Sequence, residues 1–163
     1  MTRIDGEKVQ VKKLPTVLEE LIDAVLVKFH KRCPNQEVLV EIPEDFVSIP
    51  MDAMLIEQVL INILENAVDH AKGMTTLRLH VKLSEDAACF TITDNGCGIP
   101  PERLEKLFTG YLDASATPAD AKRSNMGIGL SVCAAIVKAH GSEINAWNNP
   151  DGGASFSFSL KLH

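Results

Sequence analysis

Val59-Leu60-Ile61-Asn62-Ile63-Leu64-Glu65-Asn66-Ala67 is the most informative run in this chain of 163 residues. It lies inside a predicted helix that follows an N-cap at Asp52 and ends near Ala71. With about 100° of rotation per residue, apolar side chains gather on one broad side of this helix, which predicts packing against a core. The opposite side carries Gln58, Asn62, Glu65, Asn66 and Asp69, with His70 at its margin.

The two asparagines are unusual at these positions. Asparagine is a poor helix former, because its amide competes for backbone partners. Asn62 and Asn66 are four residues apart, so their side chains lie one above the other. Two stacked amide oxygens can ligate Mg²⁺, which takes oxygen ligands and usually shares substrate phosphates. An ordinary solvated face is the alternative, and the helix alone leaves both interpretations open.

A glycine-rich turn, Asp94 to Pro100, follows a predicted strand at Ala88–Thr93. Phe90, Ile92 and Asp94 point to the same side of that strand, so the carboxylate lies at the edge of the core. A carboxylate there needs a donor, and an adenine amino group could supply one. A simple Asx turn with glycines at positive φ is the alternative.

Two further glycine pairs follow. Gly127 and Gly129 lie at the start of a predicted helix, Ile128–Ala139, where backbone amides and the helix dipole favour phosphate. Arg123 could reach the same phosphates, and a solvated loop arginine is the alternative. Gly152-Gly153 precedes Ala154-Ser155-Phe156 and by itself indicates only a hairpin turn.

The rest of the pattern predicts alternating helices and strands. The implied fold is α+β: a two-layer sandwich with a mixed sheet of about five strands and three main helices on one face. A loop at Thr109–Asn125 has no apolar period, and loops of that length are usually functional or disordered. The other predicted elements are helices at Leu14–Lys31 and Pro101–Leu107 and strands at Glu37–Ile42, Thr76–Leu83, Ile144–Trp147 and Ala154–Leu160.

Composition excludes several classes of protein. Hydrophobic residues make up 45% of the chain, which indicates a globular fold. The net charge of −6 argues against non-specific nucleic-acid or anionic-membrane binding, which needs a basic surface. The four cysteines form no C-x-x-C pair, so we expect reduced thiols and no zinc site. No apolar run has the length of a membrane span or a signal peptide.

In combination, these motifs resemble one superfamily. An asparagine helix, D-x-G-x-G after a strand, a long loop, G-x-G-L and a G-G-x-S-F hairpin are similar to the Bergerat-type fold of DNA gyrase, the ninety-kilodalton heat-shock chaperone, mismatch-repair ATPases and histidine kinases. The resemblance spans about Leu14 to Leu162. Within it, Val59–Ala67 resembles the histidine kinase N box, Leu107–Tyr111 a diverged F box, and His140-Gly141-Ser142 the His-Gly-Gly motif. Glu57–Ala67 is similar to the potassium-responsive sensor kinases.

The resemblance implies a function. A histidine kinase catalytic domain binds Mg-ATP and donates the γ-phosphoryl group to a histidine on a separate dimerisation and phosphoacceptor module, which then serves a response regulator. In the hydrolase branches a glutamate stands where this chain has Asn62, and an amide cannot act as a general base. A serine kinase of the anti-sigma type and a degenerate interaction domain with the same fold are the alternatives.

The resemblance also implies roles for single residues. Asp94 would bind the adenine amino group, Gly98 and Ile99 would line the base, and Ser155 would lie near it through water. Asn62 and Asn66 would approach Mg²⁺. The residues expected to contact ATP are Asn62, Asn66, Asp69, His70, Asp94, Gly96, Gly98, Ile99, Arg123, Gly127, Ile128, Gly129, Leu130 and Ser155.

Some positions depart from the family pattern. Asp69-His70 stands where Lys-Tyr is usual, and an aspartate in place of a phosphate-facing lysine predicts weak ATP binding. The F box has Gly110 for proline.

No histidine fits the phosphoacceptor motif, so we expect the acceptor on another module. The expected organisation is a leader at 1–13 and a catalytic domain at 14–163 with an ATP lid at about 109–126, facing the cytoplasm as part of a membrane-anchored sensor without membrane contact of its own.

Overall fold

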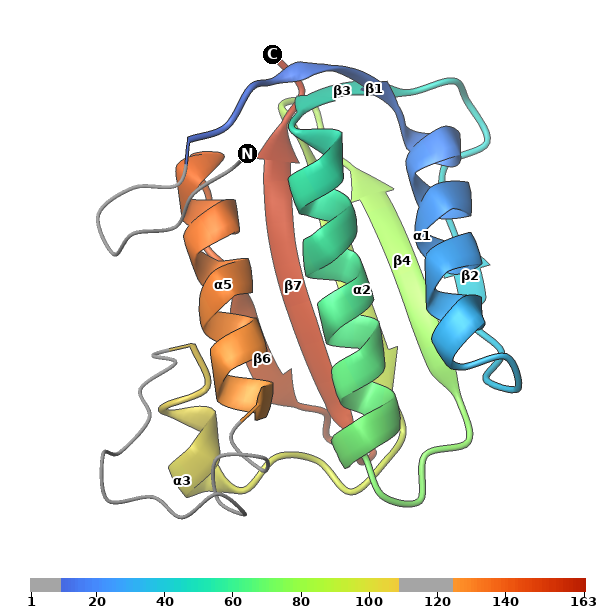
Figure 1. Ribbon diagram of the computed structural model, residues 1–163, viewed down its shortest axis with the longest axis vertical. Coiled ribbons are helices and arrows are strands. Elements are labelled where there is room, and N and C mark those ends of the chain that lie inside the picture. The colour runs from blue at the N-terminus through green and yellow to red at the C-terminus, as the bar shows by residue number, and fades with distance from the viewer. Residues whose placement is uncertain (1–9, 109–124) are drawn as a thin grey trace.

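The computed structural model describes residues 10–108 and 125–163, with side chains in the second segment described from residue 129. Five strands form the main sheet in the order β2-β4-β5-β7-β6 (Figure 1). The β2–β4 pair is parallel and the other three pairs are antiparallel, so the sheet is mixed as predicted. The strands are β2 (Leu39–Glu41), β4 (Leu77–Leu83), β5 (Ala87–Asp94), β6 (Asn145–Asn148) and β7 (Ala154–Lys161).

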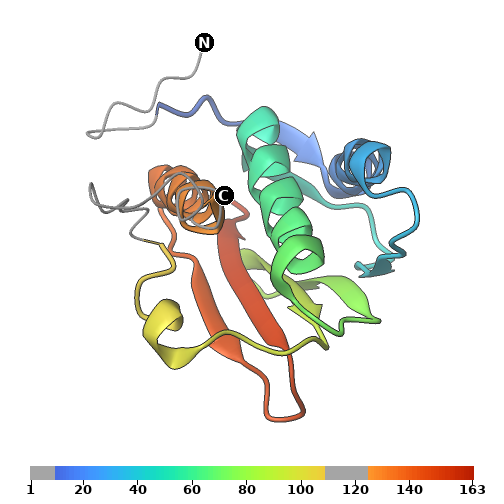
Figure 2. The same cartoon turned by 60° about the horizontal axis from the view of Figure 1, so that its bottom comes forward.

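Three helices cover one face of this sheet (Figure 2). They are α1 (Leu18–Arg32), α2 (Ala53–His70) and α5 (Asn125–Ala139). In the view of Figure 1, α2 crosses the middle of the sheet, with α1 on one side and α5 on the other. This arrangement confirms the predicted α+β two-layer architecture. None of the described helices combines the length and the apolar character that a bilayer crossing requires.

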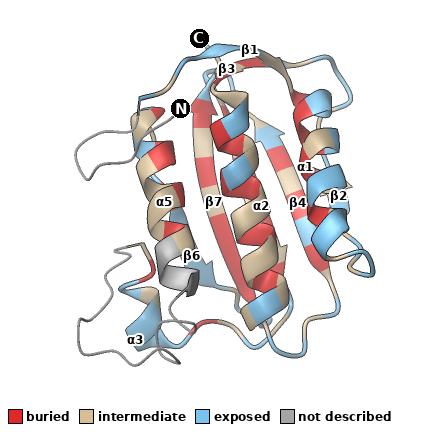
Figure 3. Cartoon of the chain, viewed as in Figure 1, coloured by how far each residue is buried: buried red, intermediate tan, exposed pale blue. Residues whose placement is uncertain are grey.

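The core lies between the helices and the sheet (Figure 3). The apolar side of α2 is buried as predicted, with Ile56, Val59, Leu60 and Leu64 each at 0% exposure. Alternate residues of β5 are buried down to Asp94, because successive side chains of a strand point to opposite faces. The buried aromatic pair Phe90 and Phe158 stacks with ring centroids 5.1 Å apart.

A small second sheet corrects the predicted start of the first helix. Leu14–Val17 forms strand β1, antiparallel to β3 (Ser48–Met51), with Leu14 opposite Met51. The helix begins only at Leu18, whose N–H donates to the Val47 carbonyl at 2.9 Å. Over four residues, helical spacing and strand pairing fit the same apolar side chains, so the sequence pattern did not separate them.

The ends of the other helices bear directly on the site. The helix after Asp52 runs from Ala53 to His70, close to its predicted limits. The short helix α3 is only Pro101–Leu104. The last helix begins at Asn125, three residues before the predicted start, so the final residues of the proposed lid belong to it. The remainder of that lid, 109–124, lies outside the described residues.

Candidate functional site

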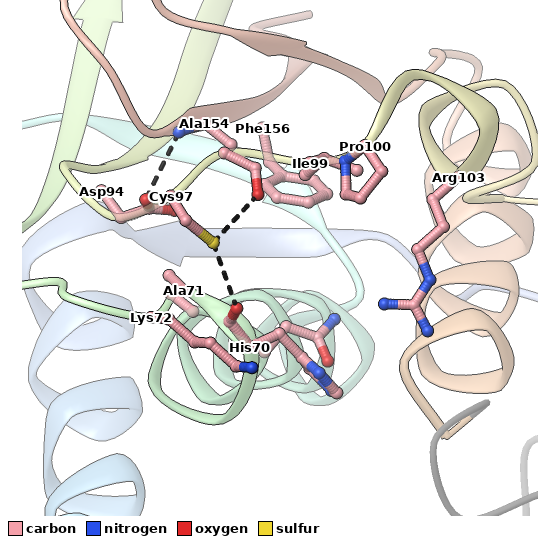
Figure 4. A pocket seen from close by; sticks show the side chains of 13 residues that line it. His70, Ala71, Lys72, Asp94, Cys97, Ile99, Pro100, Arg103, Ala154 and Phe156 are labelled. Carbon is pink, nitrogen blue, oxygen red and sulfur yellow. Dashed lines mark hydrogen bonds between the residues drawn. The ribbon is translucent and has the colours of Figure 1, made fainter. Parts of the chain in front are cut away.

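A cavity of about 240 Å³ opens at one end of the two-layer sandwich, where α2 and β5 end and β7 begins (Figure 4). Its lining comes from four regions that are distant in the sequence: the end of α2, the glycine turn after β5, the short helix α3 and the start of β7. Five residues predicted from the sequence line it: Asn66, His70, Asp94, Gly98 and Ile99. Also in the lining are Ala67, Ala71, Lys72, Cys97, Pro100, Arg103, Ala154 and Phe156.

Asp94 is the buried acid of the cavity, with 6% of its surface exposed. Its Oδ1 accepts hydrogen bonds from the Gly96 N–H at 2.8 Å and the Ala154 N–H at 3.3 Å. Among the described residues, its second oxygen, Oδ2, has no hydrogen-bond partner. Two backbone donors therefore fix the carboxyl group while one oxygen stays available, which is the arrangement needed to accept a hydrogen bond from a ligand amino group.

The glycine turn is held against β6 by one asparagine side chain. Asn148 accepts the Ile99 N–H at 2.7 Å through its Oδ1 and donates to the Ile99 carbonyl at 2.8 Å through its Nδ2. Gly98 has φ of +80°, a conformation that disfavours any side chain. A Cβ at Gly153 would collide with the Asp94 backbone. The floor of the cavity beside Asp94 is thus fixed by close backbone contacts.

The two asparagines of α2 lie in different surroundings. Asn66 lines the cavity, and its Nδ2 is buried without a hydrogen-bond partner among the described residues. Asn62, one turn earlier, instead faces α5, where its Nδ2 lies 3.8 Å from the Cys133 sulfur. Gly129 lies next to it, since a Cβ there would come within 4.0 Å of the same Nδ2. Burial raises the pKa of the Cys133 thiol to about 12, so this sulfur stays protonated.

Asp69 and His70 are both predicted to contact ATP, and the structure places them in different surroundings. His70 lines the cavity. Burial lowers its pKa, Asp69 opposes that shift, and the positive charge of Arg103 adds to it. The carboxylate of Asp69 lies outside the cavity lining and receives two hydrogen bonds from Arg32, at 3.0 and 3.2 Å. This position does not favour the predicted contact of Asp69 with ATP, because its charge is neutralised by Arg32 on the outer surface of α1 and α2.

Ser155 is also placed differently. Its hydroxyl donates to Asn149 at 2.7 Å and lies 3.0 Å from the Thr93 hydroxyl, and the residue is absent from the cavity lining. Strand alternation explains this position, because Ala154 and Phe156 on either side of it do line the cavity. The water-mediated approach of Ser155 to adenine stays a prediction. Gly96 does not line it either. Its role is spatial, since a Cβ there would lie 2.7 Å from the Ala71 Cβ.

The predicted phosphate-binding turn is only partly described. Leu130 is fully buried in the core, and Gly129 lies in α5 beside Asn62. Arg123 lies outside the described residues, and the side chains of 125–128, which include Ile128, do too. Gly127 falls in the first turn of α5. The proposed contacts of this group with phosphate stay predictions.

Sequence reasoning did not find several residues that line the cavity or hold its lining in place. Phe156 could have been found from the alternation of β7 with the buried Phe158. Asn148 gives no local signal, because its partner is 49 residues away. Arg103 lies on the predicted helix after Pro101 and looks like any exposed arginine in sequence. Only the fold brings it to the cavity.

Two sensor proteins have sequences similar to this chain. The chain is 34% identical over 160 residues to the sensor protein KdpD of Clostridium acetobutylicum, covering 98% of this chain and 18% of that protein. It is 32% identical over 163 residues to KdpD of Escherichia coli, covering 98% of this chain and 17% of that protein. The chain thus spans less than a fifth of the length of these relatives.

The fold has close counterparts among solved structures. Histidine kinase ThkA, solved in complex with the response regulator protein TrrA, matches with a TM-score of 0.74 and 24% identity, covering 97% of this chain and 44% of that one. Residues 51–163 match the family described as histidine kinase-, DNA gyrase B-, and HSP90-like ATPase. The chain therefore belongs to that family and is a histidine kinase ATP-binding catalytic domain, similar in sequence to the matching part of the KdpD sensor proteins.

Proposed function

We propose that this domain binds Mg-ATP in the cavity between α2, the glycine turn and β7, and that it presents the γ-phosphoryl group to a histidine on a separate module. The single observation that carries the proposal is the meeting of two incompletely partnered polar groups in one cavity. Oδ2 of Asp94 and Nδ2 of Asn66 both lack a hydrogen-bond partner within the described residues. Buried polar groups are normally paired, so a ligand is their natural partner.

The base fits the end of the cavity at Asp94. A carboxylate oxygen that accepts the 6-amino hydrogen of adenine would reject guanine, whose corresponding group is a carbonyl. Ile99, Pro100 and Phe156 supply apolar surface around it. We infer that the domain selects adenine nucleotides by this one charged hydrogen bond together with apolar contact.

The described residues supply only part of a coordination shell for Mg²⁺. The described residues include no cluster of three or more His, Cys, Asp or Glu side chains able to hold an ion. Mg²⁺ usually takes one or two protein oxygens and completes its shell with phosphates and water, so the Asn66 amide oxygen is a sufficient protein ligand. Bound Mg²⁺ would neutralise negative charge on the phosphates.

The chain's own residues favour transfer over hydrolysis. Asn62 cannot take a proton from water, because an amide is not a base at neutral pH. Positioning and charge neutralisation are nearly all that phosphoryl transfer requires of the protein. The acceptor would be the phosphoacceptor module of the same kinase, which would then serve a response regulator. The ThkA–TrrA complex supports such a partnership. We place the domain on the cytoplasmic side of a membrane-anchored sensor.

Radioactive phosphotransfer tests the proposal. The chain is mixed with the dimerisation module of its own full-length protein and γ-labelled ATP with Mg²⁺. Label on that module that is stable in base and lost in acid is the expected result. Acid-stable label on a serine would favour the anti-sigma alternative. No transfer, with no Mg-ATP-dependent thermal shift either, would leave the interaction-domain alternative.

A further inference from the structure

The cavity has a positively charged end opposite Asp94. In Figure 4, Asp94 and Arg103 lie at opposite sides of the cavity, with His70 between them on the helix below. Both Asp94 and Arg103 belong to its lining. We propose that Arg103 is a phosphate-binding residue of this domain, which contacts the phosphate chain of the nucleotide whose base is held at Asp94. This inference rests on the proposed function and adds a residue to it.

Arg103 is held in place by its helix. The N–H groups of Arg103 and Leu104 both donate to the Pro100 carbonyl at 2.9 Å, which closes the first turn of α3. Leu107, just after α3, is buried at 4% exposure, and the Phe108 ring packs edge-on against Phe156 with centroids 6.3 Å apart. These contacts hold the backbone around Arg103 close to β7, while its exposed side chain can extend to a ligand.

Arg103 differs from the other described arginines because it has no acidic partner among the described residues. Arg32 pairs with Glu65 and Asp69, and Arg78 pairs with Glu41 at 3.5 Å. No described acidic residue lies within ion-pair distance of the Arg103 guanidinium. Its charge is instead felt by His70, whose pKa is lowered first by burial and further by Arg103. An unpaired guanidinium facing a cavity is an anion-binding group without a protein anion.

The chemistry of the cavity points to phosphate as that anion. His70 is neutral near pH 7 because its pKa is lowered from 6.5, so the cations of the lining are Lys72 and Arg103. In Figure 4, Lys72 lies on the Asp94 side and Arg103 on the other. A nucleotide with its base at Asp94 directs its other end away from that acid. The planar guanidinium of arginine can donate to two phosphate oxygens at once, whereas the ammonium group of lysine does not match them in this way.

The test compares ligands with and without phosphate. Dissociation constants of ATP and adenosine, both with Mg²⁺, are measured by NMR titration for the wild type, Arg103→Ala and Arg103→Lys. Arg103→Ala is expected to weaken ATP binding by about five- to tenfold, the size of one partly exposed charged hydrogen bond. Adenosine affinity should change less than about twofold, and Arg103→Lys should recover part of the loss for ATP.

A matched control and a second variant separate this inference from the proposed function. Arg78→Ala removes an exposed arginine that is paired with Glu41 outside the cavity, and it should leave both affinities unchanged. Unchanged ATP affinity in Arg103→Ala, or an equal loss for adenosine, overturns the role of Arg103. If Asp94→Asn abolishes binding of both ligands while Arg103→Ala does nothing, only the phosphate inference fails. If Asp94→Asn also leaves both affinities unchanged, the proposed nucleotide site itself fails.

Discussion

The two ends of the cavity are built in different ways. At the Asp94 end, hydrogen bonds that involve backbone groups do the positioning: the Gly96 and Ala154 N–H groups donate to the carboxylate, and the Asn148 side chain holds the Ile99 backbone through two hydrogen bonds. At the opposite end, Arg103 is exposed and its guanidinium has no partner among the described residues. The first end has one fixed geometry before any ligand arrives, whereas the second offers charge on a flexible side chain.

This difference indicates that the two ends of the cavity have separate functions. A fixed acid between close backbone contacts can discriminate one base from another, because a misplaced partner leaves a buried charge unpaired. A cation on a flexible side chain contributes attraction and tolerates several phosphate positions. Changes at the Asp94 end should therefore abolish recognition, while changes at the other end should only reduce affinity.

Asp94→Asn gives the largest expected effect. Losing the charged acceptor for the adenine amino group should weaken ATP binding about 100-fold, or roughly 3 kcal/mol. Calorimetric titration with Mg-ATP measures it. Asp151→Asn, in the exposed hairpin turn before β7, is the matched control and should bind as the wild type does. An Asp94→Asn protein that binds within a few-fold of wild type would remove the distinction between the two ends.

His140→Gln should change stability without changing which ligand binds. The buried His140 ring joins α5 to α2: its Nδ1 contacts the Ile136 carbonyl at 2.8 Å, and its Nε2 accepts the Asp52 N–H at 3.1 Å. Losing part of this arrangement should cost about 1–3 kcal/mol of unfolding free energy in urea denaturation. Preference for ATP over GTP in the folded variant should stay as in the wild type, since this junction lies away from the cavity lining.

The same histidine predicts a pH dependence. Burial lowers the pKa of His140 below 6.5, so the unfolded chain takes up a proton that the folded chain resists. Its contribution to stability is fully present above about pH 6.5 and is lost as the pH falls through the lowered folded value. His70 acts in the same direction. Unfolding free energies between pH 7.5 and 5.5 should therefore fall less steeply in His140→Gln; equal slopes would contradict this assignment.

Asn66→Ala should have an intermediate effect that depends on the metal. Loss of the amide that lines the cavity should weaken ATP binding about tenfold with Mg²⁺ present and much less with EDTA. Asn145→Ala, an exposed asparagine on β6, provides the control. A loss of equal size with and without Mg²⁺ would show that Asn66 contacts the nucleotide directly and is not a metal ligand.

Asp69→Asn should have the smallest effect on binding. Its carboxylate lies outside the cavity lining and is paired with Arg32. ATP affinity should shift by less than about twofold, because exposed ion pairs contribute little. The weak overall affinity that follows from the absence of a lysine here should remain, so a wild-type dissociation constant in the low micromolar range would contradict that expectation.

Sequence reasoning succeeded where local pattern determines position. The alternation of β5 placed Asp94 beside the core, and the helical period of α2 placed Asn66 on its polar side. It failed where tertiary pairing decides. Leu14 fits a helix until β3 is present to pair with it. Nothing in the sequence indicated that the Ser155 hydroxyl lies beside the Thr93 hydroxyl. Asn148 could not be found, because its hydrogen bonds join segments 49 residues apart.

The most direct measurement is a crystal of the domain soaked with Mg²⁺ and a non-hydrolysable ATP analogue. We expect the adenine amino group within hydrogen-bond distance of Asp94 Oδ2 and the phosphate chain extending toward Arg103, with the Asn66 amide at the metal. An adenine bound elsewhere, or a cavity closed by the protein's own side chains, would contradict the assignment of this cavity as the ATP site.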